Sequence, residues 1–209
     1  MKVIDLTHAL ENDMPVYSQQ NSPDIKKIST IEENGYEETF LSMFSHNGTH
    51  IDSTKHMYKY GETLDLLDID NFVGKAILIE VENKKYIELE ELKKYEKNIK
   101  SCDYIIFKSG WEKYWGDSKY YEGYPVLTKD AAKYLANSNI KGIGIDMLSV
   151  DSYDTIDFDI HHILFEGGKL IVENLMNLNN LPKEFLFIAA PLKYNNADGS
   201  PVRAIAMFD

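Results

Sequence analysis

The stretch HNGTHIDSTKH, residues 46 to 56, contains three of the chain's six histidines and an aspartate. Residues of the same parity project from one face of an extended strand, so His46, His50 and Asp52 are predicted to share a face. Gly48 falls between the two histidines and would leave room for an ion or a substrate. Two imidazoles and a carboxylate on one face indicate a metal site.

Packing explains these residues less well. Single histidines are common in cores and on surfaces, but a buried strand normally presents aliphatic side chains. Three histidines and an aspartate, at spacings of four, two and four residues around Gly48-Thr49, depart from that pattern. The sequence therefore favours a functional role.

The segment resembles the hallmark His-x-Gly-Thr-His-x-Asp-x-Pro-x-His of the bacterial cyclase-like metal hydrolases, a family that includes the kynurenine formamidases. The one departure is Thr54 at the usual proline position, which alters a backbone restriction but no proposed ligand. Further similarities run in order along nearly the whole chain, at Asp5–His8, Met14–Tyr17, Ser109–Trp111, Gly144–Asp151, His161–Leu175, Ala190–Leu192 and Ala197–Arg203.

The resemblance implies a two-metal site. In the family, a histidine and a glutamate twelve residues later complete the ligand set, and His161 and Glu173 have this spacing. By the same correspondence His46 and His50 would bind the first ion and His161 the second, while Asp52 and Glu173 would bridge both. Without the resemblance, His161 would be taken as a residue of a helix start and Glu173 as an exposed strand residue.

The ligand types limit the choice of metal. Cys102 is the only cysteine, so thiolate sites are excluded and any metal is bound by nitrogen and oxygen. Such ligands suit zinc, manganese or iron better than calcium or magnesium. We expect two zinc ions per subunit, with manganese as the alternative. A bound dication can lower the pKa of water from 15.7 to about 7, which suits amide hydrolysis.

Two further residues receive roles. An imidazole, with an ordinary pKa near 6.5, can take a proton from water and deliver it to a leaving nitrogen, and the resemblance implies this acid–base role for His56. The other interpretation makes His56 itself a ligand. Tyr17 stands where the formamidases have a substrate-contacting tryptophan, and it is expected to stack on an aryl ring. The rest of their Trp-Pro-Gly-Asp segment is replaced by Ser18-Gln19-Gln20.

The reaction is therefore better defined than the substrate. We expect metal-dependent hydrolysis of the C–N bond of a small aryl formamide of the N-formylkynurenine type, with a place in tryptophan catabolism. A cyclic amide of the isatin type is the alternative substrate. From a different class, the chain would be a catalytically silent protein that binds a metal or a small molecule. His56 argues against this, because a pure metal binder does not need it.

A length of 209 residues permits one or two domains, and we expect a single α/β domain, residues 1–209. Hydrophobic patterns predict strands at 75–82, 103–108, 142–146, 169–174, 185–190 and 202–207. Helices are predicted at 88–98, from the N-cap Thr128 through Leu135, and at about 159–165, where Asp157 or Asp159 would cap. Segments 18–22 and 194–200 are expected to be loops. The resemblance implies a central mixed sheet with flanking helices and an additional β layer, of the swivelling β/β/α type.

Charge and composition constrain the partners. The net charge of −12 and the scattered lysines make nucleic acid an unlikely partner. No run approaches the roughly 20 apolar residues of a membrane span, and the first residues lack a signal-peptide pattern, so we expect a cytoplasmic enzyme acting on a small molecule. The resemblance implies a homo-oligomer, a dimer or a tetramer. His8 and His162 are expected to be structural.

Overall fold

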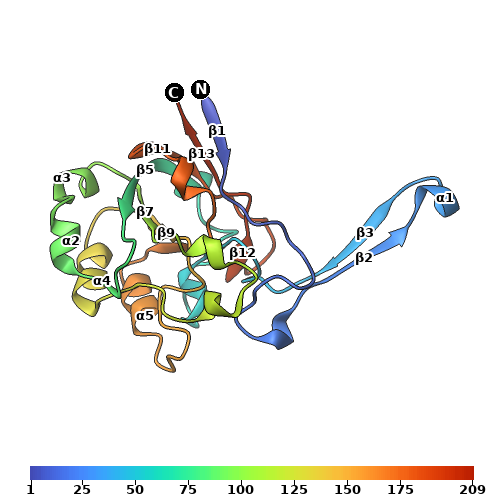
Figure 1. Ribbon diagram of the computed structural model, residues 1–209, viewed down its shortest axis with the longest axis horizontal. Helices are drawn as coiled ribbons and strands as arrows, with labels where there is room; N and C mark the ends of the chain where they lie inside the picture. Colours follow the sequence, from blue (N-terminus) through green and yellow to red (C-terminus); the bar gives the residue numbers. More distant parts are fainter.

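The computed structural model describes all 209 residues and is built around one mixed sheet of nine strands (Figure 1). The strand order is β1-β13-β11-β5-β7-β9-β10-β4-β12. The central strands β5, β7, β9 and β10 are parallel, and the outer strands are antiparallel to their neighbours. The bounds are β1 Lys2–Asp5, β4 His50–Asp52, β5 Val73–Glu80, β7 Tyr104–Lys108, β9 Gly142–Ile145, β10 Leu170–Glu173, β11 Glu184–Ile188, β12 Gly199–Pro201 and β13 Ile205–Phe208.

One face of the central strands packs against helices. Alternation along the strands sends Ile77, Ile105 and Ile143 into a hydrophobic cluster that also contains Leu92 and Leu135 from the helices. The helices that cover this face are α2 Leu89–Lys93, α3 Glu96–Ile99, α4 Lys129–Ala136 and α5 Asp159–Glu166.

The opposite face is covered by the ends of the same sheet. Ala76 and Ile106 of the central strands lie in a second cluster with Leu6, Ile51 and Phe187, which come from strands or segments near both edges. The sheet therefore curls over its own core, and its ends supply the additional β layer. The expected α/β class is confirmed. None of the helices combines the length and the apolar character needed to cross a membrane.

The predicted strands between residues 73 and 190 are found, each displaced by no more than two residues. The predicted strand 202–207 begins later, at Ile205, because Val202 forms only an isolated bridge with Pro191. The predicted loop 194–200 contains the start of β12 at Gly199, and segment 18–22 contains a short 3-10 helix. The 3-10 helices are Gln19–Asn21, Thr54–His56, Ile69–Phe72, Trp111–Tyr114, Ser118–Tyr121 and Leu178–Asn180.

The helix predicted over 88–98 is broken into α2 and α3 at Tyr95, although no glycine or proline marks the break. Thr128 caps α4 as predicted, since its hydroxyl accepts the N–H of Ala131. The predicted caps of α5 are wrong, because neither Asp157 nor Asp159 is its N-cap. The first N–H groups of α5 are instead bound by a more distant carboxylate, described below.

A β-hairpin projects away from this body (Figure 1). It consists of β2 Asp24–Ser29 and β3 Glu38–Ser42, with the single-turn helix α1 Ile31–Asn34 near its tip. The remaining two strands, β6 Tyr86–Ile87 and β8 Val126–Leu127, form a small parallel pair. Nothing in the sequence pattern had predicted the hairpin.

Candidate metal centre

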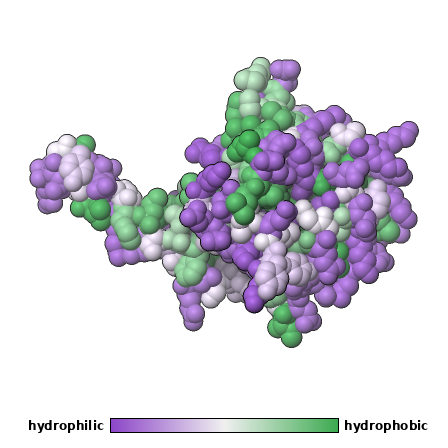
Figure 2. Space-filling model, turned by 180° about the vertical axis from the view of Figure 1, so that it is seen from behind, coloured by the Kyte–Doolittle hydropathy of each residue, from purple (hydrophilic) through white to green (hydrophobic).

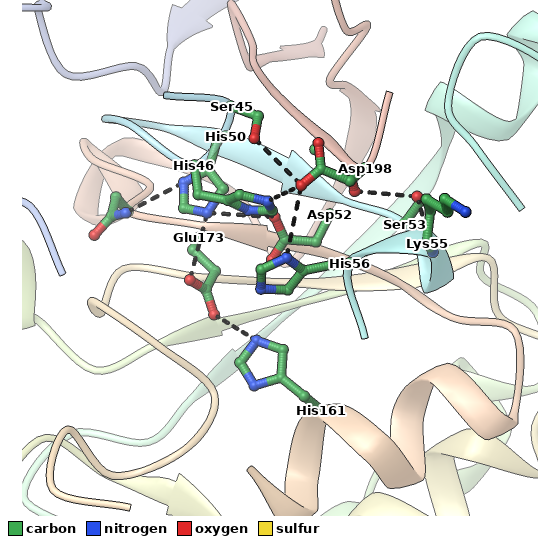
Figure 3. A network of polar contacts seen from close by, with 12 residues as sticks. Ser45, His46, His50, Asp52, Ser53, Lys55, His56, His161, Glu173 and Asp198 are labelled. Carbon is green, nitrogen blue, oxygen red and sulfur yellow. Dashed lines mark hydrogen bonds and ion pairs between the residues drawn. The ribbon is translucent and has the colours of Figure 1, made fainter. Parts of the chain in front are cut away.

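The pairing of β4 with β10 brings distant parts of the chain to one site. The two strands are antiparallel, and Glu173 lies directly opposite His50. Side chains two residues apart on a strand lie on the same face of the sheet, and so does the residue directly opposite on the neighbouring strand. His50, Asp52 and Glu173 therefore project from one face. His161, near the start of α5, faces this group, with Nε2 3.6 Å from Glu173 Oε1 (Figure 3).

His46 reaches the site by a different route from the predicted one. The expectation of one extended strand from residue 46 to residue 52 is wrong, because the strand begins at His50 and residues 45–49 turn. Gly48 has a φ of 64°, in the left-handed region. A Cβ there would lie 2.8 Å from Leu10 Cδ2, so Gly48 serves the turn and does not open space for an ion. The turn places His46 Nδ1 2.6 Å from Asp52 Oδ1.

The two most buried histidines, His50 and His161, direct their Nε2 atoms towards the carboxylates. His50 donates its Nδ1–H to the Gly48 carbonyl at 2.8 Å, and His161 donates its Nδ1–H to an Asp151 carboxylate oxygen at 2.7 Å. In the neutral form of each ring, Nε2 then carries a lone pair. His50 Nε2 then faces Asp52 Oδ1 at 3.4 Å and Glu173 Oε2 at 3.6 Å. Acceptors that face one another in this way fit a cation between them.

Asp151 also explains the start of α5. Its carboxylate accepts the N–H groups of Ile160 at 2.9 Å and His161 at 3.0 Å. Because one carboxylate holds both the backbone and the imidazole of His161, the ring direction is fixed. Burial opposes the charge on Asp151, yet the His161 hydrogen bond and these N–H groups lower its pKa.

The electrostatics of the buried carboxylates also fit a dication. Asp52 and Glu173 are buried, and neither forms an ion pair with a lysine or an arginine. Burial and the neighbouring Asp52 raise the pKa of Glu173 well above its usual range. Burial also opposes the charge on Asp52, but His50 and His46 hold its pKa well below the usual range. A dication could replace the protons that Glu173 and His46 hold in the metal-free protein and stabilise both carboxylates in their charged form.

The two histidines of the motif differ in charge in the metal-free protein. Burial lowers the pKa of His50 to about 4, so this ring is neutral at pH 7, as a ligand must be. Burial has the same effect on His46, but it is outweighed by Asp52 and Asp198, and the pKa rises to about 10. A metal that binds His46 must therefore displace a proton.

Asp198 belongs to the site but was not predicted from the sequence. Its Oδ2 accepts a hydrogen bond from His46 Nε2 at 2.9 Å and another from Ser45 Oγ at 3.3 Å. The same oxygen lies 3.8 Å from His56 Nδ1. The hydrogen bond from His46 and the nearby His56 ring hold the pKa of Asp198 well below its usual range. The only sequence signal was its place in the similar segment Ala197–Arg203. The adjacent Gly199 lets the His46 ring approach, since a Cβ there would lie 2.4 Å from His46 Cε1.

His56 lies beside the predicted ligands at the end of a 3-10 helix, Thr54–His56. Its ring centroid is 3.9 Å from that of His46 and 6.1 Å from that of His161. Thr54, which replaces the family's proline, accepts the N–H of Glu62 through its hydroxyl at 2.8 Å and so ties the turn. His46, His56 and Asp198 also lie close enough to share an ion, which keeps the ligand interpretation of His56 open.

A cavity of about 330 Å³ opens over this cluster. The predicted ligands and His56 form one side of it. Tyr17 also lines it. The apolar residues are Pro15, Val16, Tyr17, Met57, Leu148 and Phe158. The remaining histidines are outside the cluster: His8 stacks on Trp115 with ring centroids 3.9 Å apart, and His162 Nδ1 is 3.2 Å from the Tyr58 hydroxyl.

A curled sheet whose buried histidines and carboxylates line a cavity is the arrangement expected of a metal-dependent enzyme. The sequence model of the family described as "Putative cyclase" matches residues 4–152, and the chain belongs to this family. It is similar to the kynurenine formamidase of Bacillus thuringiensis (strain Al Hakam), with 31% identity over 203 residues that cover 97% of this chain and 95% of that protein.

Two solved structures show the same fold. A predicted metal-dependent hydrolase from Bacillus stearothermophilus is 30% identical, with a TM-score of 0.81 and coverage of 98% of this chain and 97% of that one. Isatin hydrolase A from Labrenzia aggregata, bound to benzyl benzoate, is 26% identical, with a TM-score of 0.87 and coverage of 99% and 93%. These relatives, together with the possible ligand groups, support a metal cofactor.

Proposed function

We propose that this protein hydrolyses the C–N bond of a small aryl formamide of the N-formylkynurenine type in a metal-dependent reaction. Residues 1–209 act as one catalytic domain. The observation that carries the proposal is that Nε2 of His50 lies within 3.6 Å of the buried carboxylates of Asp52 and Glu173, and Nε2 of His161 within 3.6 Å of that of Glu173, beside the cavity. The similarity to kynurenine formamidases supports the substrate class.

We propose two ions per subunit. His46 and His50 hold the first, His161 holds the second, and Asp52 and Glu173 are shared. Asp52 belongs to two of the three possible ligand groups, His46-His50-Asp52 and Asp52-His161-Glu173, which supports this division. Zinc suits the nitrogen and oxygen donors best, with manganese as the alternative. When bound, such ions supply activation of water and polarisation of a carbonyl.

The residues around the ions carry the remaining steps. His56 takes the proton of the attacking water and delivers it to the leaving nitrogen. Its Nδ1 faces Asp198, which leaves Nε2 for this exchange. Tyr17, which lines the cavity, contacts the aryl part of the substrate. The similarity to isatin hydrolase A favours a cyclic aryl amide as the second candidate substrate. The presence of His56 in the cavity wall argues against a silent metal-binding protein.

We also propose that the enzyme is a cytoplasmic homo-oligomer, a dimer or a tetramer, with no nucleic-acid partner. An isolated two-stranded hairpin is marginally stable in water, and hydrophobic side chains lie along the projecting arm (Figure 2). A second copy of the chain would cover them. The exposed hydrophobic residues of the arm and its base are Ile28, Ile31, Tyr36, Phe40, Leu41 and Phe44.

The proposal is tested by metal analysis and by assays with N-formylkynurenine and isatin. We expect about two zinc or manganese ions per chain and turnover of the formamide. His56→Ala should keep the metal and lose 10²- to 10⁴-fold in kcat, as expected for a general acid–base residue. If His56→Ala also loses metal, His56 is a ligand. A protein that takes up no metal after reconstitution would refute the proposed function.

A further inference from the structure

Phe158 has a backbone conformation that its side chain does not favour. Its φ of 48° and ψ of 41° lie in the left-handed region. The other non-glycine residues with positive φ are all asparagines, Asn83, Asn174, Asn177 and Asn196. Asparagine tolerates this region, whereas a bulky aromatic residue there is an outlier. An outlier of this kind at a site points to a role for the side chain.

The local structure does not require phenylalanine at this position. Phe158 is the N-cap of α5, but its side chain makes no capping hydrogen bond. The first N–H groups of the helix are bound by Asp151 instead. A glycine or an asparagine would therefore satisfy the backbone better. The reason for phenylalanine must lie in what its ring contacts.

The Phe158 ring lines the cavity and lies near both Tyr17 and the predicted metal ligand His161. Its centroid is 6.2 Å from the Tyr17 ring at an interplanar angle of 46°. It is also 6.1 Å from the His161 imidazole, which it meets nearly edge-on at 76°. Both distances lie within the range of favourable aromatic pairs. Tyr17 and Phe158 thus form one aromatic wall that ends beside His161.

The segment before Phe158 is anchored on two sides, which keeps the wall in place. The Tyr17 hydroxyl donates to the Tyr153 carbonyl, and the Tyr153 hydroxyl donates to the Tyr17 carbonyl, both at 3.2 Å. At the other end Asp151 holds the start of α5. A strained backbone persists when its surroundings determine it in this way.

We propose that Phe158 is a specificity-determining residue that selects substrates whose scissile amide is attached directly to a flat aromatic ring. This inference rests on the proposed amide hydrolysis. A planar ring packed on the wall formed by Tyr17 and Phe158 has its substituent beside His161, at the predicted metal ligands. A saturated ring of the same size is puckered and lacks the π face that pairs with aromatic side chains.

The test compares formanilide with N-cyclohexylformamide, which have the same number of ring atoms but differ in flatness. The zinc-loaded wild type and the Phe158→Leu and Phe158→Asn variants are assayed for kcat/KM with both compounds. The ratio of the two values removes the intrinsic difference in reactivity when variants are compared with wild type. We expect the ratio to fall about tenfold in both variants. Phe158→Asn should also melt no lower than Phe158→Leu, because asparagine tolerates the left-handed backbone.

Ile156→Asn is the matched control. Ile156 lies on the same segment, is 87% exposed and does not line the cavity, so its substitution should leave the ratio unchanged. An unchanged ratio in both Phe158 variants would overturn the inference. An equal loss of kcat/KM for both compounds would also overturn it, because Phe158 would then only support His161.

Binding separates this inference from the proposed function. If the wild type hydrolyses neither compound, the proposed function is at fault. Calorimetric titration of both compounds into the zinc-loaded proteins still decides the role of Phe158. A preference for formanilide that is lost in the Phe158 variants supports the inference. A preference that persists in them contradicts it.

Discussion

Removal of the Asp198 carboxylate should weaken metal binding although Asp198 is not among the predicted ligands. The carboxylate accepts a hydrogen bond from His46 Nε2 at 2.9 Å, while His46 Nδ1 on the other side of the ring faces Asp52. A hydrogen-bonded acceptor behind a ligating imidazole fixes its tautomer and its orientation. Asp198→Ala removes that acceptor, while Asp198→Asn keeps an acceptor oxygen but loses the charge. We therefore expect graded effects, with Asn milder than Ala.

The magnitude follows from the contact and its exposure. Loss of such an acceptor typically costs 10- to 100-fold in metal affinity. The Asp198 side chain is 39% exposed, so water partly replaces it and the lower end applies. A tenfold loss corresponds to about 1.4 kcal/mol. At a free zinc concentration well above both dissociation constants, the same amount is lost from stability. For a domain of this size the melting temperature should fall by about 3 to 6 °C.

The assay is a competitive zinc titration against a chelating dye, combined with thermal melts at fixed free zinc and in excess chelator. Asp65→Asn is the matched control, because Asp65 Oδ1 accepts the N–H of Ala197 in the same loop but does not contact a predicted ligand. The control should retain the wild-type zinc affinity. In chelator, the melting temperatures of Asp198→Ala and wild type should differ less than in zinc.

Two results would refute this reasoning. A zinc affinity of Asp198→Ala equal to that of wild type would show that Asp198 does not support His46. An equal loss in Asp65→Asn would show that the position of the loop matters and not the carboxylate of Asp198.

Three further predictions concern other parts of the molecule. Burial lowers the pKa of His8 to about 4. Between this value and pH 6.5, His8 is protonated in the unfolded chain but neutral in the folded protein. Between pH 7 and pH 4.5, urea titrations of wild type should lose about 2 to 3 kcal/mol more free energy of unfolding than those of His8→Phe, because the variant lacks this contribution. In the same assay, Gly48→Ala should lower the free energy of unfolding more than Gly35→Ala does. Both glycines have a positive φ, but only at Gly48 would the added Cβ meet a close neighbour, Leu10. Phe40→Ser combined with Leu41→Ser, both exposed on the hairpin, should shift the enzyme towards monomers in sedimentation velocity, and an unchanged oligomer would exclude these positions from the interface.

The sequence predicted the central strands because short apolar runs between polar segments are a local signal. Residues 104–108 and 142–145 are strands of the buried parallel core, where both faces must be apolar. The candidate ligands were also found from the sequence, since the motif and the twelve-residue spacing of His161 and Glu173 are local patterns. Their convergence depended on the resemblance, because no spacing states that β4 pairs with β10.

The sequence-based predictions were wrong where a residue distant in the sequence makes the contact expected of a neighbouring one. Asp157 and Asp159 are suitable caps by type and position, but Asp151 binds the start of α5 from outside the helix. His46 was placed on a strand by parity, yet Gly48 adopts a left-handed turn in which the glycine packs against Leu10. In both cases local propensity was overridden by a contact that brings a histidine to the site.

The difference between local and distant signals also separates the predicted ligands from the hydrogen-bond acceptors that orient their rings. A short motif is enough to identify His46 and His50, but the acceptors behind the imidazoles come from three parts of the chain. Gly48 is two residues from His50, Asp151 is ten residues from His161, and Asp198 is 152 residues from His46. The nitrogen that each ring offers to a metal depends on these acceptors. The predicted ligands are therefore encoded locally, whereas the direction in which each ring points depends on the folded chain. We expect a variant that disturbs Asp198 to lose metal even though its motif is intact.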